Sequence, residues 1–205
     1  MKMKKAVVFV AMLALVCALA FADNLVPFGD METGSTSNWM EEGSSLKIEA
    51  GKGIDGSKAL LVKNTEDWSG VGLDVTKIID RTKSYYIECW FKLYKAEKND
   101  IKASITLEFR PEGGDEWTQY GYVQTGIDFD EYMDKCTGNE VVVPATEFVK
   151  VSGVIRPEDM EELIDNDGKV ITKPITGITC YFKVEPAKAR RYWIDNVIIE
   201  EIPNV

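Results

Sequence analysis

The 205-residue chain has 24 Lys and Arg against 34 Asp and Glu, and it contains no His. The lack of imidazole excludes Ser-His-Asp and Cys-His nucleophile systems, His-ligated zinc and histidine proton relays. The net charge of −10 argues against a nucleic-acid partner, because nucleic-acid binding requires clustered Lys and Arg.

Residues 1–22 have the pattern of an export signal. Three lysines in residues 1–5 precede an apolar run over residues 6–19, and Ala20-Phe21-Ala22 offers the small residues that signal peptidase accepts. The run is shorter than the ~20 residues needed to cross a bilayer, so cleavage after Ala22 is expected rather than membrane anchoring. We therefore predict a secreted, periplasmic or cell-surface protein in which residues 23–205 form a single domain.

Alternation of apolar and polar residues dominates the rest of the chain. Residues 85–94 place Tyr85, Ile87, Cys89, Phe91 and Leu93 on one parity and more polar side chains on the other, as in a half-buried strand. Residues 103–110 alternate in the same way, and a turn at residues 111–115 leads into residues 117–124. These three runs are predicted to be consecutive antiparallel strands.

The remaining elements complete an all-β pattern. Further strands are predicted at residues 46–48, 58–63, 70–75, 148–155, 177–184 and 192–201, and the only helix at residues 157–164. Many short strands with almost no helix predict a sandwich of two antiparallel sheets. The acidic stretch at residues 126–143 is long for a hairpin loop, and such loops are often functional.

Three cysteines, Cys89, Cys136 and Cys180, would remain after cleavage. An exported protein can form a disulfide, but Cys89 and Cys180 lie within apolar strand-like runs and suit buried thiols equally well. Both alternatives stay open. The sequence has no CxxC or other metal-ligand spacing of cysteines.

Five segments of the chain resemble motifs of the carbohydrate-binding modules in families four, nine and twenty-two, in the same order. They are NLVPFGDMETG at residues 24–34 followed by Trp39, DGSKAL at 55–60, NTEDWSG at 64–70, YYIECWFK at 85–92 and YWIDNV at 192–197. The resemblance covers nearly the whole chain after the export signal. It implies a jelly-roll β-sandwich of the galactose-binding-domain-like type.

The resemblance also implies a structural calcium ion. Its ligands would be the carboxylates of Glu32, Asp55 and Asp195 and the carbonyls of Asp30 and Lys58. A hard divalent cation takes six to eight oxygen ligands, so such a site would connect both ends of the chain to a hairpin.

Sugar recognition requires flat apolar rings with polar groups beside them. Trp68 occupies a position whose aromatic commonly stacks on sugar in the similar modules, and Tyr181 matches another of their segments. Tyr120, Tyr122 and Gln124 alternate along a strand expected to line the same concave sheet. Trp90 and Trp117 are expected to be ordinary strand residues, and Trp39 and Trp193 core residues.

The predicted function is therefore non-catalytic binding of a polysaccharide of the β-glucan, xylan or mannan type. Lys183 and either Glu41 or Glu42 depart from the pattern of the xylan-binding modules, which usually have Glu and Arg near these positions. One alternative is a glycoside hydrolase, with Glu88 and Glu108 as paired carboxylates on adjacent strands. The other is an exported interaction protein that uses a sandwich face or the acidic loop to bind a protein partner.

Overall fold

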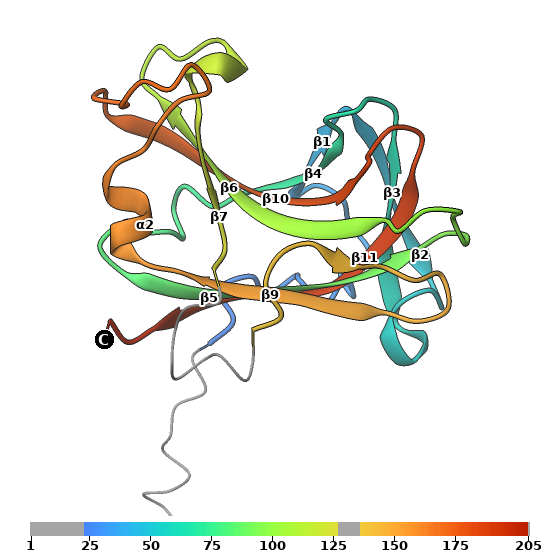
Figure 1. Ribbon diagram of the computed structural model, residues 1–205. Helices are drawn as coiled ribbons and strands as arrows, with labels where there is room; N and C mark the ends of the chain where they lie inside the picture. The colour runs from blue at the N-terminus through green and yellow to red at the C-terminus, as the bar shows by residue number, and fades with distance from the viewer. Residues whose placement is uncertain (1–22, 127–135, 205) are drawn as a thin grey trace, which may run out of the picture.

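The computed structural model describes residues 23–126 and 136–204, so the predicted export signal and most of the acidic loop lie outside the described residues. Two antiparallel sheets pack face to face (Figure 1). Among the described residues, no helix is long and apolar enough to cross a membrane.

Each sheet has one of the last two strands of the chain at its centre. The six-stranded sheet has the order β1-β4-β10-β6-β7, with β8 also paired to β6, and the five-stranded sheet has the order β2-β3-β11-β5-β9. The strands of the first sheet are β1 (Trp39–Glu42), β4 (Gly70–Asp74), β6 (Lys102–Pro111), β7 (Gly121–Gln124), β8 (Val141–Val142) and β10 (Ile175–Glu185). Those of the second are β2 (Ser44–Ala50), β3 (Lys58–Asn64), β5 (Ser84–Leu93), β9 (Val149–Ile155) and β11 (Arg191–Ile202). The predicted β-sandwich is confirmed.

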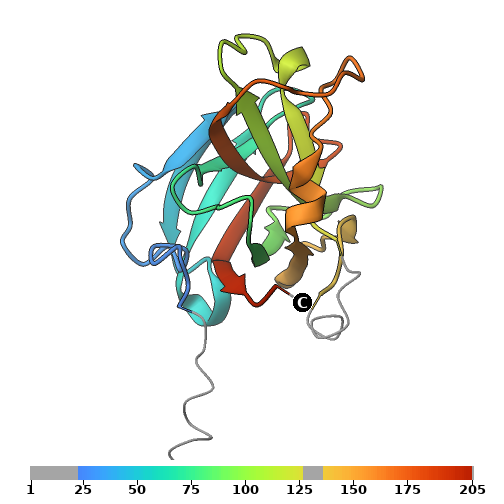
Figure 2. The ribbon, with the colours of Figure 1, turned by 90° about the vertical axis from the view of Figure 1, so that its left-hand side faces the viewer.

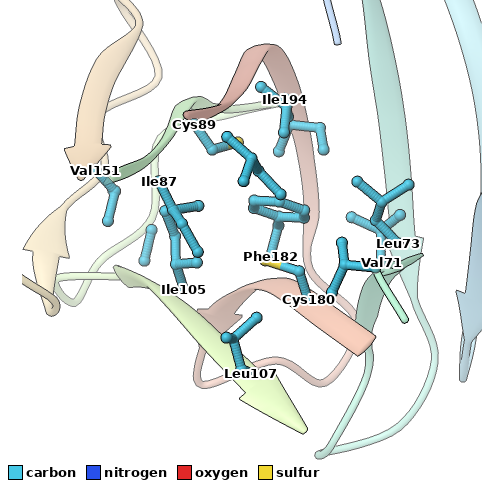
Figure 3. Close-up of a cluster of buried hydrophobic side chains, with 14 of the residues drawn as sticks. Val71, Leu73, Ile87, Cys89, Ile105, Leu107, Val151, Cys180, Phe182 and Ile194 are labelled. Atoms are coloured by element: carbon cyan, nitrogen blue, oxygen red, sulfur yellow. The ribbon is translucent and has the colours of Figure 1, made fainter. Parts of the chain in front are cut away.

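The core forms between the apolar faces of the two sheets. Figure 3 shows Val71, Leu73, Ile105, Leu107, Cys180 and Phe182 of the six-stranded sheet beside Ile87, Cys89, Val151 and Ile194 of the five-stranded sheet. All these side chains are buried. Because alternate residues of a strand point to opposite faces, the other set of side chains points toward the outside of the sandwich. That outer surface is where polar and aromatic side chains are available for binding.

Several predicted elements are shorter than expected. The helix α2 (Pro157–Glu161) covers only the first part of residues 157–164, and Trp117–Gln119 forms a 3-10 turn, η2, before the strand β7. Figure 2 shows α2 on the side of the sandwich away from β1, β2 and β3. A second 3-10 turn, η1 (Ile54–Gly56), lies in the β2–β3 hairpin. The short strands β1 and β8 were not predicted.

No disulfide joins the three cysteines of the described residues. Cys89 and Cys180 are fully buried in the core, and their burial raises the pKa of each thiol. Of the two alternatives for these cysteines, the structure supports small buried thiols.

Candidate functional site

The outer face of the six-stranded sheet brings together four of the five residues predicted to contact sugar. Cross-strand pairing places Met40, Gly72, Tyr181, Thr106 and Gln124 in one row, and Asp74, Thr179, Glu108 and Tyr122 in the next. Tyr120 precedes β7 and lies beside Arg110, whose Cζ is 5.2 Å from the centre of its ring. The period-two pattern therefore located this face correctly, although the sequence contained no direct information on which strands pair.

A buried carboxylate lies at the centre of the outer face. Glu108 is only 5 % exposed, and its Oε2 accepts a hydrogen bond of 3.2 Å from the Tyr122 hydroxyl. The guanidinium of Arg110 lies 3.7 Å from its other oxygen. Burial raises the pKa of Glu108, while hydrogen bonding from Tyr122 and the positive charge of Arg110 oppose that rise. Glu108 thus fixes the orientation of the half-exposed Tyr122 ring.

Tyr181 is held in a similar way on the neighbouring strand. Burial is the main cause of the raised pKa of Tyr181, followed by the negative charges of Glu108 and Glu42. Its hydroxyl hydrogen-bonds with Glu42, which lies at the end of β1. A tyrosine hydroxyl is protonated at neutral pH, so Tyr181 donates this hydrogen bond to the Glu42 carboxylate.

Thr106 is a polar group of this face that the sequence did not single out. Its side chain is 5 % exposed, and within the described residues its Oγ1 has no hydrogen-bond partner. It is the direct cross-strand neighbour of both Tyr181 and Gln124. A buried hydroxyl without a partner costs roughly 1–3 kcal/mol, so a ligand hydroxyl at this point would remove a penalty.

Two tryptophans near the ends of the six-stranded sheet are the most exposed aromatic residues described. Trp68 is 65 % exposed in the β3–β4 loop, where its ring lies against Gly43 of the β1–β2 turn. Trp117 is 67 % exposed in η2, directly before β7. The expectation that Trp117 is an ordinary strand residue was wrong. Its position in a turn rich in Gly and Asp was the signal that could have identified it.

The paired carboxylates of the hydrolase alternative do not face one another. Glu88 lies on β5 of the five-stranded sheet and Glu108 on β6 of the other sheet, and both point away from the core. The core therefore separates them, so the prediction that they lie on adjacent strands was wrong. Glu88 accepts hydrogen bonds from Tyr86 (2.6 Å) and Trp90 (2.7 Å), which makes it part of a local network on its own sheet.

The other tryptophans pack as structural residues. Trp39 is buried in the central core. Trp193 is also buried, but in a satellite cluster with Ala59 and Leu61 on the outside of the five-stranded sheet. Its indole donates a hydrogen bond of 3.1 Å to Glu49.

The predicted calcium ligands come together only in part. Asp195 is buried, and its Oδ2 accepts hydrogen bonds from the Ile54 amide (2.8 Å) and the Ser57 hydroxyl (3.0 Å). The Lys58 carbonyl lies beside it, since both oxygens would be within 2.6 Å of a Cβ placed on Gly53. Burial raises the pKa of Asp195, and the negative charge of Glu32 adds to the rise.

The donor set matches a hard cation in its chemistry but not in the number of carboxylates. Glu32 accepts a hydrogen bond of 2.7 Å from the Lys58 amide, while the Lys58 ammonium bonds to the Glu32 carbonyl at 2.8 Å. The Asp55 side chain is exposed, and Asp30 uses its carboxylate to accept a hydrogen bond from the Glu32 amide. Within residues 23–126 and 136–204, no three acidic, His or Cys side chains are close enough to hold a metal. Glu32, Asp195 and the Lys58 carbonyl are the oxygens that fit.

A two-sheet sandwich with aromatic and polar side chains on one outer face has the groups that carbohydrate binding requires. The carbohydrate binding domain family CBM_4_9 matches residues 23–161, and the chain belongs to this family. A search of curated proteins gave no match.

Several solved structures of carbohydrate-binding modules have the same fold. The CBM22-1 xylan-binding domain of Paenibacillus barcinonensis Xyn10C is 20 % identical with a TM-score of 0.62, over 86 % of this chain and 94 % of that one. The CBM22-2 xylan-binding domain of the same enzyme is 14 % identical with a TM-score of 0.61, over 85 % and 98 %. The C-terminal family 22 module of Clostridium thermocellum Xyn10B is 15 % identical with a TM-score of 0.56, over 86 % and 94 %. At these identities the likeness shows the fold.

Proposed function

We propose that the chain binds a neutral polysaccharide of the β-glucan, xylan or mannan type on the outer face of the six-stranded sheet, without cleaving it. The observation that carries the proposal is the combination of Tyr122, Tyr181 and Gln124 around the unpartnered hydroxyl of Thr106. Ring faces cover the CH surfaces of a pyranose, and the polar groups satisfy its hydroxyls. The family membership supports a sugar ligand, and the xylan named for the similar structures makes xylan one of the three polymers to test.

Each residue has a distinct task in this proposal. Tyr122 and Tyr181 present rings whose orientation is fixed by hydrogen bonds to Glu108 and Glu42. Gln124 and Thr106 offer hydrogen-bonding groups beside those rings. Trp68 extends the apolar surface at one end of the sheet. The carboxylates of Glu108 and Glu42 disfavour anionic sugars on this face, so we expect a neutral polymer.

Electrophoresis of residues 23–205 in native gels containing each soluble polymer tests the proposal. We expect at least one neutral polymer to slow migration, and Trp68→Ala to weaken the apparent affinity at least threefold, because one aromatic stacking contact contributes about 0.5–1.5 kcal/mol. Tyr94→Ala removes a half-exposed ring from the opposite face and is the matched control. No retardation by any of the three polymers, or equal loss in both variants, would contradict the proposal. Release of reducing ends from a polymer would contradict the proposal that the chain binds the polysaccharide without cleaving it.

We further propose that a calcium ion is held by Glu32, Asp195 and the Lys58 carbonyl. The Lys58 ammonium lies 4.0 Å from a Glu32 carboxylate oxygen, and calcium would add the positive charge that Asp195 lacks. Residues 23–205 should then unfold at a higher temperature in 5 mM calcium than in EDTA by roughly 2–4 °C, which corresponds to about 1 kcal/mol of binding energy for a domain of this size. Asp195→Asn should abolish the difference, whereas Asp165→Asn, in a turn elsewhere, should keep it. A calcium-independent midpoint in the unaltered chain would refute the site.

The export signal stays a prediction, because residues 1–22 lie outside the described residues. We propose that the chain is secreted after cleavage at Ala22. Amino-terminal sequencing of the protein recovered outside the cytoplasm should begin at Asp23, and recovery of the uncleaved chain inside the cell would contradict this part of the proposal.

A further inference from the structure

The outer face of the five-stranded sheet carries an unusual group of cations. Lys63 on β3 and Arg191 on β11 are direct cross-strand neighbours. Lys92 lies one row further along, opposite Trp193. Throughout the described part of the chain, none of these three cations has a carboxylate oxygen within 4.0 Å. We refer to Lys63, Lys92 and Arg191, with the rings of Tyr94 and Trp193, as the cationic face.

The clustering is unfavourable for the isolated fold. Like charges directly opposite each other on neighbouring strands destabilise a sheet. The chain has an excess of ten acidic over basic side chains, so carboxylates were available to pair with these cations. The flanking lysines of the same sheet are in fact paired, since Lys47 lies 2.9 Å from Glu49 and Lys150 lies 3.6 Å from Glu88. Among the described residues Lys63, Lys92 and Arg191 have no such ion pair, and Glu49, which is paired with Lys47, also accepts the hydrogen bond from Trp193.

Aromatic rings lie between the three cations. Tyr94 is 47 % exposed, and its ring centre is 5.1 Å from that of Trp193. The Arg191 guanidinium lies 5.7 Å from the centre of the Tyr94 ring, and the Lys92 ammonium lies 5.7 Å from the centre of the Phe148 ring. These contacts hold Arg191 and Lys92 at the surface over the faces of aromatic rings. The face therefore offers positive charge and apolar contact at the same place.

We propose that the cationic face binds a carboxylated polysaccharide, a sugar chain that carries uronate groups. The carboxylates would pair with Lys63, Arg191 and Lys92, and the CH surface of the sugar ring would contact Tyr94. Charge complementarity identifies the ligand as an anion, and the exposed ring selects a carbohydrate over a simple anion. The face lies on the opposite side of the sandwich from the proposed neutral site (Figure 1), so the two sites are independent.

Binding of polygalacturonate by residues 23–205 tests this proposal directly. In native gels at about 20 mM salt we expect retardation, with an affinity that falls as salt rises, because exposed charges are screened. The double variant Lys63→Gln/Arg191→Gln should bind at least tenfold more weakly. The matched double variant Lys77→Gln/Lys169→Gln loses the same two charges elsewhere and should bind within about twofold of the unaltered chain. Equal weakening in both double variants would overturn the proposal in favour of a general charge effect.

Three further measurements make the result specific. Tyr94→Ala should weaken polygalacturonate binding severalfold, whereas Trp68→Ala should leave it unchanged. The same polymer after reduction of its carboxyl groups, and poly-L-glutamate, should both fail to bind at the cationic face. Binding of poly-L-glutamate as tight as that of polygalacturonate would overturn the choice of a sugar ligand. A thermal midpoint for Lys63→Gln/Arg191→Gln at or above that of the unaltered chain shows that the variant is folded, because it removes a repulsive pair.

Discussion

Glu108 illustrates how the role of a residue depends on the strand beside it. In the sequence it was one of two carboxylates considered for catalysis, and in the structure it is a buried acceptor for the Tyr122 hydroxyl. A carboxylate that is almost fully buried is costly unless it is hydrogen-bonded, and the hydrogen bond from Tyr122 both reduces that cost and positions the tyrosine ring. This role follows from strand pairing, which residue type alone does not specify.

We predict that Glu108→Gln changes stability in a pH-dependent manner. Because burial raises the pKa of Glu108, the folded state binds the proton more tightly than the unfolded state does. Protonated Glu108 therefore stabilises the fold below about pH 4.5, the ordinary pKa that applies to this carboxyl in the unfolded chain. This stabilisation is lost as the pH rises through the raised pKa of Glu108 in the folded protein. The variant should therefore gain thermal stability relative to the unaltered chain between pH 4 and pH 7. An exposed control, Glu112→Gln, should show no such trend, and a pH-independent difference for Glu108→Gln would contradict the prediction.

Thr106 provides a second prediction at the scale of one residue, and it depends on the proposed neutral site. Thr106→Val keeps the shape of the side chain and removes a hydroxyl that has no partner among the described residues. Its free energy of unfolding should be unchanged or higher by about 1 kcal/mol. Affinity for the neutral polymer should fall severalfold, because the ligand loses that partner. Calorimetric titration and thermal unfolding measure the two effects, and Thr106→Ser should retain binding. Lower stability with unchanged affinity would show a structural role only.

At the scale of the elements, the alternation of residues 85–94 and 103–110 was sufficient to predict strands and their buried parity. It was not sufficient to predict that β5 and β6 lie in different sheets. Strands alternate with a period of two whether the next strand of the chain pairs with them or lies in the other sheet. The two-residue strand β8 is too short to show a period. The outer-face position of Tyr122, Gln124 and Tyr181 was thus predictable, whereas their neighbours Thr106 and Glu42 depended on the pairing partners.

The β2–β3 hairpin gives a prediction about a close backbone approach. A Cβ on Gly53 would lie 2.4 Å from the Lys58 carbonyl oxygen and 2.6 Å from the Asp195 carboxylate. Gly53→Ala should therefore lower the free energy of unfolding by about 1–3 kcal/mol, the usual cost of overpacking. Gly177→Ala is the matched control, since its nearest contact would be an ordinary 3.6 Å, and its effect should stay below about 1 kcal/mol. Denaturant unfolding measures both, and equal effects would contradict the steric reason.

At the scale of the whole molecule, the buried thiols report on global unfolding. Cys89 and Cys180 face the shared core of the two sheets, whereas Cys136 is partly exposed. In residues 23–205 a thiol reagent should modify Cys136 readily, and Cys89 and Cys180 only at the rate of unfolding, because buried thiols with raised pKa values react poorly. Peptide mass mapping after timed labelling checks this. Rapid labelling of Cys89, or a mass that is two hydrogens lower, would contradict it.

The arrangement of β10 and β11 has a consequence for the order in which the molecule is completed. Without these two strands, the six-stranded sheet separates into β1-β4 and the β6 group, and the five-stranded sheet into β2-β3 and β5-β9. A nascent chain that has been synthesised only as far as residue 174 therefore lacks the middle of both layers. The ribosome must release both β10 and β11 before either layer can close. Both layers therefore become complete together, and only at the end of synthesis.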